Sequence, residues 1–396
     1  MRLIDNPVWQ HKQDFMRVVI EMERLGIGVD VDLCNRMAEK GLDQMERIKK
    51  ALNADPAKRG DLEGLLLDEL DLPVVKTTPA GKPSFDKFAM EEYEEILSQR
   101  DNKTAQLILA FRGWQKSVSS NYKPYVELLS PDGRLRPNYK LHGTRTGRMS
   151  CEKPNLQQIP KEGTKPWNGK MKECFIPEPG YKLVEFDYSQ LELRLATAYT
   201  KDESLMAVFA EGRDIFTEMS KDLGMTRQET KGLVYSIQYG AGVRRISNIF
   251  NVSNGEARRI ISNFYSTYPG FRTMSNACEQ IVLSKGSLRL ISGRRRHFQY
   301  PRDEARKSFN SLIQGGAADL VERAMVRLHK RIVNDDCRML LQVHDSVIFE
   351  IKEDKVFEYG PQILDILRDH ENVDLEEVTF DCDGHWLGGD TIEFGN

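Results

Sequence analysis

Residues 183–194 read LVEFDYSQLELR and indicate the fold class of this chain of 396 residues. The apolar run that opens this stretch is typical of a buried strand, and a helical spacing of apolar residues follows Asp187. A second strand-like run occupies 339–343, and mostly helical patterns separate the two runs. Distant strands joined by long helical excursions predict an α+β fold, with a small antiparallel sheet built from remote parts of the chain.

The composition is that of a globular protein with a sizeable core. Hydrophobic residues make up 40% of the chain and charged residues 30%, which excludes wholesale disorder and a fibrous repeat. No apolar run reaches the roughly 18 residues of a membrane span, and the first residues lack the apolar region of a signal peptide. The six cysteines form no C-x-x-C pair, so we expect unpaired thiols in a reducing compartment rather than a zinc site.

The formal net charge of −3 hides an uneven distribution. Residues 351–396 hold 3 Lys/Arg and 13 Asp/Glu, a net of −10, and taking this from −3 leaves +7 for residues 1–350. Residues 285–307 carry eight basic side chains against two acidic ones, for +6. A basic stretch beside an acidic tail suits a protein with one face for a polyanion, although a solvated charged surface explains the charge alone equally well.

A second informative stretch, residues 340–350, reads LLQVHDSVIFE. Two apolar runs flank His344 and Asp345, and a carboxylate in such surroundings needs pairing, hydration or a bound cation. A plain hairpin turn favours Asn-Gly or Asp-Gly, which His-Asp does not match. Asp187 in isolation also fits a helix cap. Two carboxylates on neighbouring strands of one sheet, however, are typical of a two-magnesium phosphoryl-transfer site, whose ions lie about 3.5–4 Å apart.

A third pattern repeats at every fourth position, with Arg227, Lys231, Tyr235 and Tyr239 followed by Gly240. Steps of four residues advance about 40° around an α-helix, so these side chains form one stripe. Two cations and two aromatic rings suit the binding of a triphosphate and a base. An amphipathic helix with half-buried tyrosines is the alternative interpretation of this stripe alone.

Taken together, these stretches make the sequence similar to family A DNA polymerases, the bacterial DNA polymerase I enzymes and their phage relatives. Residues 187–194 match the family motif D-Y-S-Q-x-E-L-R, residues 227–240 match R-x(3)-K-x(3)-[FY]-x(3)-Y-G, and residues 343–345 match V-H-D. Residues 146–160 resemble T-G-R-L-S…P-N-L-Q-N-I-P, and residues 306–319 resemble R-x(3)-N-x(3)-Q-G-x-A-A-D. Five motifs in the family's order exceed what chance supplies.

The resemblance implies a right-hand polymerase fold, in which the palm contains the antiparallel sheet and the fingers and thumb are helical. The expected division is an N-terminal helix and strand at 1–29, a thumb at 30–134, a palm at 135–200 and 286–396, and fingers at 201–285. The family's polymerase module begins where this chain begins, so the resemblance implies that no proofreading exonuclease is part of the chain.

The resemblance also implies an activity, the template-directed addition of deoxynucleotides to a primer 3′-hydroxyl with release of pyrophosphate. Two Mg²⁺ ions would be held by Asp187, Asp345 and the backbone carbonyl of Tyr188. The residues that would contact the incoming dNTP are Arg227, Lys231, Tyr235, Glu192, Gln190 and Tyr239, with Lys231 also placed to protonate pyrophosphate. The residues that would contact the primer–template are Arg148, Asn155, Gln157, Arg306, Asn310, Gln314 and His344.

Some positions carry expectations specific to this chain. Glu192 and Tyr235 would exclude a 2′-hydroxyl by filling the space beneath the sugar. Many relatives have Phe where this chain has Tyr235, and in the family a Tyr here goes with ready acceptance of 2′,3′-dideoxynucleotides. Ser346 stands where the family usually has Glu, an auxiliary carboxylate, so the resemblance implies activity with altered metal affinity or rate. We expect Glu350 to be structural and the basic run 294–296 to meet phosphates, with a solvated loop as the alternative.

The expected partners are primer–template DNA and dNTPs, with a separate exonuclease, helicase or processivity subunit as further candidates. The expected location is the cytoplasm, without a membrane, and the host cytoplasm if a phage encodes the chain. A single-subunit RNA polymerase is the alternative enzyme, but it must admit the 2′-hydroxyl that Glu192 would exclude. A catalytically weak DNA-binding subunit is the other alternative, and it has no reason to keep Asp187, Asp345 and the stripe together.

Overall fold

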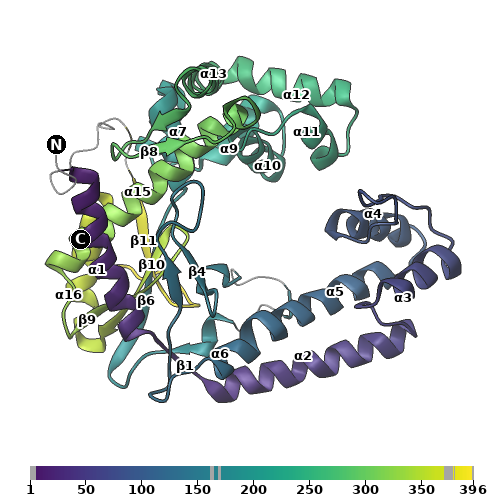
Figure 1. Cartoon of the computed structure of the whole chain (residues 1–396), viewed down its shortest axis with the longest axis horizontal. Coiled ribbons are helices and arrows are strands. Elements are labelled where there is room, and N and C mark those ends of the chain that lie inside the picture. The colour runs from purple at the N-terminus through teal and green to yellow at the C-terminus, as the bar shows by residue number, and fades with distance from the viewer. Residues whose placement is uncertain (1–5, 161–164, 168–170, 370–377, 379, 395–396) are drawn as a thin grey trace. The chain divides into compact units, whose positions relative to one another are not determined.

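The computed structural model describes residues 6–160, 165–167, 171–369, 378 and 380–394. The chain forms two compact units, and Figure 1 labels many of their helices and strands. The larger unit consists of Met1–Arg24, Tyr139–Cys151 and Pro179–Asn396, and the smaller unit of Leu25–Asn138 and Glu152–Glu178.

The larger unit is built on a four-stranded antiparallel sheet with the strand order β11-β6-β10-β9. Its strands are β6 (Tyr181–Tyr188), β9 (Cys337–Val343), β10 (Ser346–Lys352) and β11 (Cys382–Trp386). Side chains alternate between the two faces of β6, so Phe186 and Tyr188 share one face and Asp187 lies on the other. Phe186 packs edge-on against Phe349, with ring centroids 5.7 Å apart, and the Tyr188 hydroxyl donates to the Leu367 carbonyl at 2.7 Å. The predicted α+β class and the antiparallel sheet of remote segments are confirmed.

Helices make up most of the rest of the larger unit (Figure 1). They are α1 (Pro7–Leu25), α7 (Leu191–Thr200), α8 (Glu203–Ala210), α9 (Ile215–Leu223), α10 (Arg227–Gln238), α11 (Val243–Phe250), α12 (Asn254–Thr267), α13 (Pro269–Lys285), α14 (Pro301–Glu304), α15 (Ser308–Arg331) and α16 (Val356–Arg368). The long helix α15 packs against α7, α13 and α16, and buried residues occur around its whole circumference, as expected of a helix in a core. Short strands form a hairpin of β7 (Ser287–Arg289) and β8 (Arg295–His297) and a second pair, β3 (Asn138–Lys140) and β4 (Ser150–Glu152).

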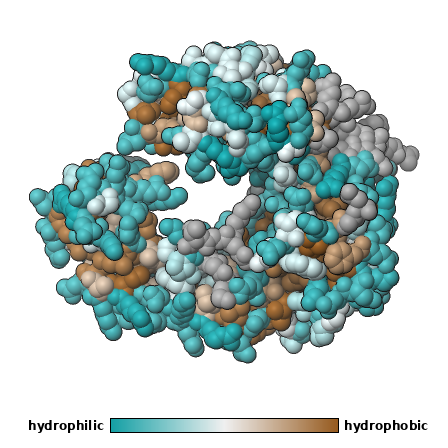
Figure 2. All heavy atoms as spheres, turned by 180° about the vertical axis from the view of Figure 1, so that it is seen from behind, coloured by the Kyte–Doolittle hydropathy of each residue, from teal (hydrophilic) through white to brown (hydrophobic). Residues whose placement is uncertain are grey.

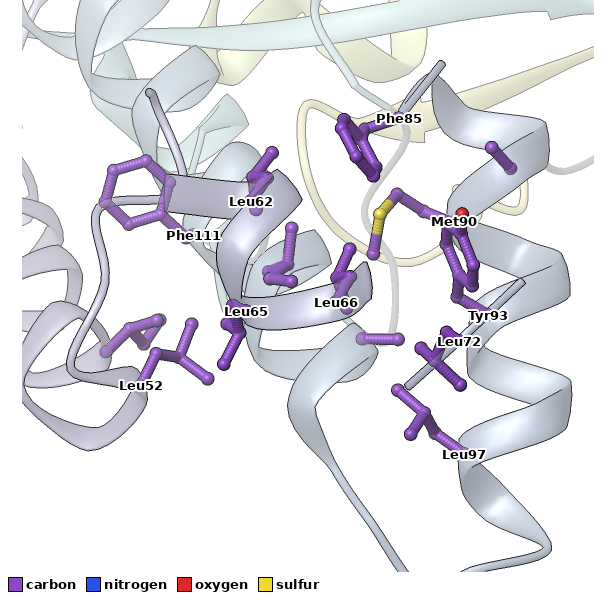
Figure 3. Close-up of a cluster of buried hydrophobic side chains, with 14 residues drawn as sticks. Leu52, Leu62, Leu65, Leu66, Leu72, Phe85, Met90, Tyr93, Leu97 and Phe111 are labelled. Atoms are coloured by element: carbon purple, nitrogen blue, oxygen red, sulfur yellow. The ribbon is translucent and has the colours of Figure 1, made fainter. Parts of the chain in front are cut away.

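The smaller unit is mainly helical. Its helices are α2 (Val31–Leu52), α3 (Arg59–Glu63), α4 (Lys87–Ser98), α5 (Thr104–Ser117) and α6 (Lys123–Glu127), and its three-stranded sheet has the order β2 (Arg134–Leu135), β1 (Ile27–Val29), β5 (Phe175–Ile176). Figure 3 shows a hydrophobic cluster in which Leu52 of α2, Leu62 of α3, Tyr93 of α4 and Phe111 of α5 meet. This cluster ties the four helices together by burying apolar side chains from each.

Several helix boundaries follow from local sequence signals. Helix α1 ends directly before Gly26, whose φ of 64° is readily adopted by glycine. Asp30 caps α2 by accepting a hydrogen bond from the Leu33 amide at 2.8 Å. The two compact units do not separate residues 201–285 from the sheet, so the predicted palm, fingers and thumb boundaries stay predictions.

Polar residues dominate the face of the molecule shown in Figure 2, with hydrophobic residues in smaller patches between them. Among the helices in the described ranges, none has the length and hydropathy that a membrane crossing requires. All six cysteines are buried, and none of them forms a disulfide bond.

Candidate active site

The sheet of the larger unit brings Asp187 and Asp345 to neighbouring positions. Asp187 of β6 pairs in register with Ser346 of β10, the residue that directly follows Asp345. The backbone amide of Tyr188 donates to the carbonyl of Asp345 at 3.4 Å. Asp345 belongs to the two-residue turn that joins β9 to β10. Two acidic residues that lie far apart in the sequence are therefore neighbours along the backbone at one end of two paired strands.

Both segments that carry these carboxylates contain a non-glycine residue with a positive φ. His344, the first residue of the β9–β10 turn, has a φ of 59°, and Gln190, which precedes α7, has a φ of 57°. The left-handed region costs an L-residue about 1–2 kcal/mol, and such conformations cluster at functional sites. The Gln190 Oε1 atom is also buried and accepts no hydrogen bond from the residues that the structure describes.

The donor set of this site suits a hard divalent cation. Asp187 and Asp345 provide carboxylate oxygens, which Mg²⁺ prefers. Within the described part of the chain, no group of three or more His, Cys, Asp or Glu side chains is arranged to hold a metal ion. Mg²⁺ typically binds through one or two carboxylates and completes its shell with water and substrate phosphates. The pair therefore fits a metal that the protein holds jointly with a phosphorylated substrate.

Ser346, where the resemblance leads one to expect a carboxylate, is hydrogen-bonded to one. Its hydroxyl donates to Oε1 of Glu185 at 2.9 Å and also lies 3.0 Å from the Val343 carbonyl. Both Ser346 and Glu185 are buried. Glu185 lies two residues before Asp187 on β6, so both carboxylates are on the same face of the sheet. A third carboxyl group thus lies beside the first residue of β10, and it is supplied by β6 rather than by β10.

Replacing Ser346 with Ala removes a donor from a buried carboxylate. We expect Ser346→Ala to lower the free energy of unfolding by about 1–3 kcal/mol, because the buried Oε1 atom of Glu185 loses this partner. Urea unfolding followed by circular dichroism measures this change, with Ser346→Thr as the control that keeps the hydroxyl. Equal unfolding midpoints for the wild-type and Ala proteins would contradict the assigned hydrogen bond.

The predicted stripe lies on α10, which starts with a capping box. Thr226 accepts a hydrogen bond from the Glu229 amide at 3.3 Å, and the Glu229 carboxylate accepts one from the Thr226 amide at 2.9 Å. Arg227 forms a two-pronged ion pair with Asp214 at 2.8 and 2.9 Å, and this guanidinium holds the pKa of Asp214 well below its usual range. Lys231 lies one turn further on, with Nζ 5.7 Å from the centre of the Phe216 ring. Both cations therefore lie beside α9.

The two tyrosines of the stripe continue it toward Glu192. The Tyr235 ring lies between Phe216 and Tyr239, with centroid distances of 5.8 and 6.2 Å. Burial raises the pKa of Tyr235 to about 12, so its hydroxyl remains protonated and able to donate at neutral pH. Tyr239 is 40% exposed, and its hydroxyl donates to Oε2 of Glu192 at 3.2 Å. Arg227, Lys231, Tyr235 and Tyr239 therefore form one stripe along α10 and its C-cap. The two tyrosines are also partly buried, as the alternative interpretation of an amphipathic helix expected.

Glu192, in the first turn of α7, is held by donors from three residues. Arg148 forms an ion pair with Oε1, while Gln238 Nε2 and the Tyr239 hydroxyl donate to Oε2 at 3.1 and 3.2 Å. Burial raises the pKa of Glu192 above its ordinary value, and the positive charge of Arg148 opposes this increase. The carboxylate is consequently fixed in orientation within a partly dehydrated setting.

The predicted primer–template residues fall in both units. The larger unit contains Arg148, Arg306, Asn310, Gln314 and His344, and the smaller unit contains Asn155 and Gln157. In the larger unit, Gln314 hydrogen-bonds the Tyr239 hydroxyl, and Oδ1 of Asn310 is buried with no partner among the described residues. Arg306 and His344 are exposed.

In the smaller unit, Asn155 caps a short 3₁₀ helix by accepting a hydrogen bond from the Gln157 amide at 3.2 Å, and Gln157 is largely buried. Both residues therefore have a local structural role within their own unit. Their predicted contact with the primer–template stays a prediction.

One part of the predicted basic surface is wrong. Arg294 points into the larger unit, where it pairs with the buried Asp319 at 2.9 Å and donates to the Thr146 carbonyl at 3.0 Å. Burial raises the pKa of Asp319, and the guanidinium of Arg294 counteracts this. Arg294 serves to neutralise a buried carboxylate and is not available to a phosphate. Glu350 is structural as expected, because it is buried and pairs with Arg338 at 3.2 Å.

Sequence reasoning overlooked Glu185 and Gln238. Each is a polar residue inside an apolar pattern, Glu185 within strand β6 and Gln238 on the buried face of α10. Buried polar residues need partners, so these interruptions were the available signal. The sequence did not show that their partners would be Ser346 and Glu192.

The fold and the site together define a class of protein. An antiparallel sheet with two neighbouring acidic residues, in one unit with a helix that carries cations and tyrosines, is the arrangement expected of the right-hand polymerase fold. A narrower assignment comes from the family model for DNA polymerase family A, which matches residues 32–386. The chain belongs to DNA polymerase family A.

Individual relatives agree with this assignment. The chain is similar to the thermostable DNA polymerase I of Thermus filiformis, with 30% identity over 415 residues that cover 98% of this chain and 49% of the relative. DNA polymerase I of Helicobacter pylori is 29% identical over 378 residues, covering 90% of this chain and 41% of the relative. The chain thus spans about half the length, or less, of these curated relatives.

A solved structure shows the same fold. The POL domain of Pol1 from M. smegmatis, in complex with DNA primer-template and dNTP, superposes with a TM-score of 0.85. It is 23% identical, and the match covers 96% of this chain and 70% of that one. The predicted right-hand polymerase fold is therefore confirmed.

Proposed function

We propose that this chain is a template-directed DNA polymerase that adds deoxynucleotides to a primer 3′-hydroxyl and releases pyrophosphate. The observation that carries the proposal is the strand register that places Asp187 beside Ser346, and hence beside Asp345, at the end of the central strand pair. Membership of DNA polymerase family A supports the reaction class. The M. smegmatis relative was solved with DNA primer-template and dNTP, which supports the same two partners here.

Asp187, Asp345 and the backbone carbonyl of Tyr188 would hold the metal, and we propose two Mg²⁺ ions on the basis of these hard oxygen donors. When bound, the ions supply charge stabilisation at the phosphoryl oxygens and activate the primer hydroxyl. The role of the chain is to hold both carboxylates at the end of a rigid sheet, where their separation is set by backbone hydrogen bonds rather than by flexible loops.

The stripe on α10 would bind the triphosphate. Lys231 presents an ammonium group that neutralises phosphate charge and donates a proton to the leaving pyrophosphate oxygen. Arg227 would exchange its exposed ion pair with Asp214 for the triphosphate, and an exposed pair stabilises by only about 0–1 kcal/mol. Gln190, Tyr235 and Tyr239 would line the space for the sugar and base. Glu192 would lie beneath the sugar and clash with a 2′-hydroxyl.

The five predicted primer–template residues of the larger unit, together with Asn155 and Gln157, would contact the minor groove, the backbone or the primer terminus. Hydrogen-bond donors suit this task, because minor-groove acceptors are shared by all Watson–Crick pairs. A separate exonuclease, helicase or processivity subunit would be a further partner. With these substrates the proposed place of action is the cytoplasm, or the host cytoplasm if the chain is encoded by a phage.

Family membership argues against a single-subunit RNA polymerase, and the held carboxylate of Glu192 argues the same way. The test is primer extension on a primed DNA template with Mg²⁺, comparing dNTPs with rNTPs. Extension with dNTPs alone is the expected result. Extension with rNTPs would establish the RNA polymerase, and tight DNA binding without extension would establish a DNA-binding subunit.

Tyr235 gives a prediction on nucleotide choice. Its protonated hydroxyl can replace the 3′-hydroxyl that a dideoxynucleotide lacks, so the wild-type chain should incorporate ddNTPs readily. We expect Tyr235→Phe to lower ddNTP incorporation relative to dNTP by about 10- to 100-fold, the value of one hydrogen bond to a charged group. Competition between ddNTP and dNTP in single-nucleotide extension measures this ratio. An unchanged ratio in the Phe variant would refute the role of the hydroxyl while leaving the polymerase activity intact.

A further inference from the structure

The carboxylate of Glu192 receives two hydrogen bonds from consecutive residues at the end of α10. Gln238 Nε2 and the Tyr239 hydroxyl both donate to Oε2, at 3.1 and 3.2 Å. The two donors differ in exposure, because Tyr239 is 40% exposed and Gln238 only 1% exposed. The Gln238 contact is therefore shielded from water, where a hydrogen bond to a charged group is strongest.

Gln238 occupies a position where the helix otherwise buries less polar side chains. Thr230, Leu233, Val234 and Ile237 lie on the buried face of α10, and Gln238 completes this face at the next position of the repeat. Its Oε1 atom is buried and has no hydrogen-bond donor among the residues described by the structure. An amide in this position is less favourable for folding than an apolar side chain, and the interaction that its Nε2 makes is with Glu192.

We propose that Gln238 is a positioning residue that fixes the Glu192 carboxylate beneath the sugar and so sets the discrimination against ribonucleotides. This inference rests on the proposed function, in which Glu192 excludes the 2′-hydroxyl. With Gln238 in place, Oε2 is held by a buried donor whatever the exposed Tyr239 ring does. Without it, Arg148 still pairs with Oε1, but Oε2 keeps only the exposed Tyr239 donor. The Oε2 atom can then swing away from the sugar and make room for a hydroxyl, because steric exclusion requires the excluding atom to be held in place.

The discriminating variant is Gln238→Leu, which keeps a similar volume and removes both the Nε2 donor and the unpaired carbonyl. We expect the ratio of kcat/KM for rNTP to that for dNTP to rise about 10-fold, the low end for a hydrogen bond to a charged group. The change should lie mainly in the KM for rNTP, with the dNTP constants close to wild type. The thermal unfolding midpoint should be equal to or above that of the wild-type chain, because an unpaired buried polar group has been removed.

Two further variants set the upper and lower limits of the expected change in the rNTP-to-dNTP ratio. Glu192→Ala removes the excluding carboxylate and sets the maximum loss of discrimination. Thr230→Val is the matched control, since Thr230 is fully buried on the same face of α10 and makes no hydrogen bond to Glu192. It should leave the rNTP-to-dNTP ratio unchanged. If Gln238→Leu does not fold, Gln238→Met tests the same loss of a donor with an unbranched side chain.

A second measurement does not depend on nucleotide incorporation. The pKa of Glu192 can be followed by NMR of a chain with ¹³C-labelled glutamate carboxyls, assigned by comparison with Glu192→Gln. Removing a donor to the charged form should raise this pKa above its wild-type value in Gln238→Leu. A chain that extends no primer would refute the proposed function, whereas this titration would still report the contact.

Two results would overturn the proposal. One is a Gln238→Leu chain with both the wild-type nucleotide ratio and the wild-type pKa of Glu192. The other is a lowered unfolding midpoint with equal losses for dNTP and rNTP, which would make Gln238 a packing residue.

Discussion

Asp345→Ala should abolish primer extension, lowering kcat by about 1,000-fold or more. Removing one of two adjacent carboxylates removes a metal ligand, whose charge stabilisation is worth several kcal/mol of the barrier at roughly 1.4 kcal/mol per tenfold in rate. Because Asp345 lies in a turn between β9 and β10, the Ala variant should keep the fold and the affinity for primed DNA. Rapid-quench single-turnover extension measures the rate, and fluorescence anisotropy measures the DNA affinity.

The matched control is Asp336→Ala, at the other end of the same hairpin. Asp336 pairs with Lys352 at 2.9 Å on the surface, far along the strands from the turn. It should extend primers at close to the wild-type rate. If the two aspartate variants lose the same activity, or if Asp345→Ala retains most of it, then the carboxylate pair is not the metal-binding centre.

Replacing Lys231 should cause the second large loss of polymerase activity. Lys231→Ala removes both a positive charge beside the triphosphate and the proposed proton donor to pyrophosphate, and general acid catalysis contributes about 10²- to 10⁴-fold. We expect a fall in kcat/KM of that order in single-nucleotide extension. Lys221→Ala is the control, because Lys221 is an exposed lysine on the neighbouring helix α9 that pairs with Glu218.

Lys231→Arg separates the two proposed roles. Arginine keeps the charge but does not release its proton in proteins, so the KM for dNTP should stay near wild type while kcat falls. A conservative variant with wild-type kcat would show that Lys231 only binds the triphosphate. A KM that rises as much as in the Ala variant would show that the ammonium geometry, rather than proton transfer, is what matters.

Much of the fold and of the candidate site was predictable, because its strands and its helical stripe follow from the local spacing of apolar and polar residues. The apolar runs around Asp187 and Asp345 predicted strands of one sheet, and these strands are β6, β9 and β10. The four-residue spacing from Arg227 to Tyr239 predicted one helical stripe, which α10 presents. Such patterns depend only on the rise and turn of a helix or strand, so they can be read without knowing what packs where.

Other features depend on which polar side chain meets which, and the chain order does not contain this information. The Ser346–Glu185 hydrogen bond follows from the register of β10 against β6. The Arg294 side chain points inward because it pairs with Asp319, a buried residue of α15. The basic run in the sequence does not reveal this partner. A single-residue change of register would send each side chain of a strand to the opposite face. These pairings are therefore decided when elements pack.

The sequence alone was sufficient for the family, the α+β class and the residues of the carboxylate pair and the stripe, because each is a local pattern of residue types. Only the tertiary structure showed that Glu185 supplies a carboxylate beside Ser346 and that Gln238 reaches Glu192. The physical reason is that a buried polar atom is satisfied by whichever group the packing of remote segments brings within about 3 Å, and that choice is made in three dimensions.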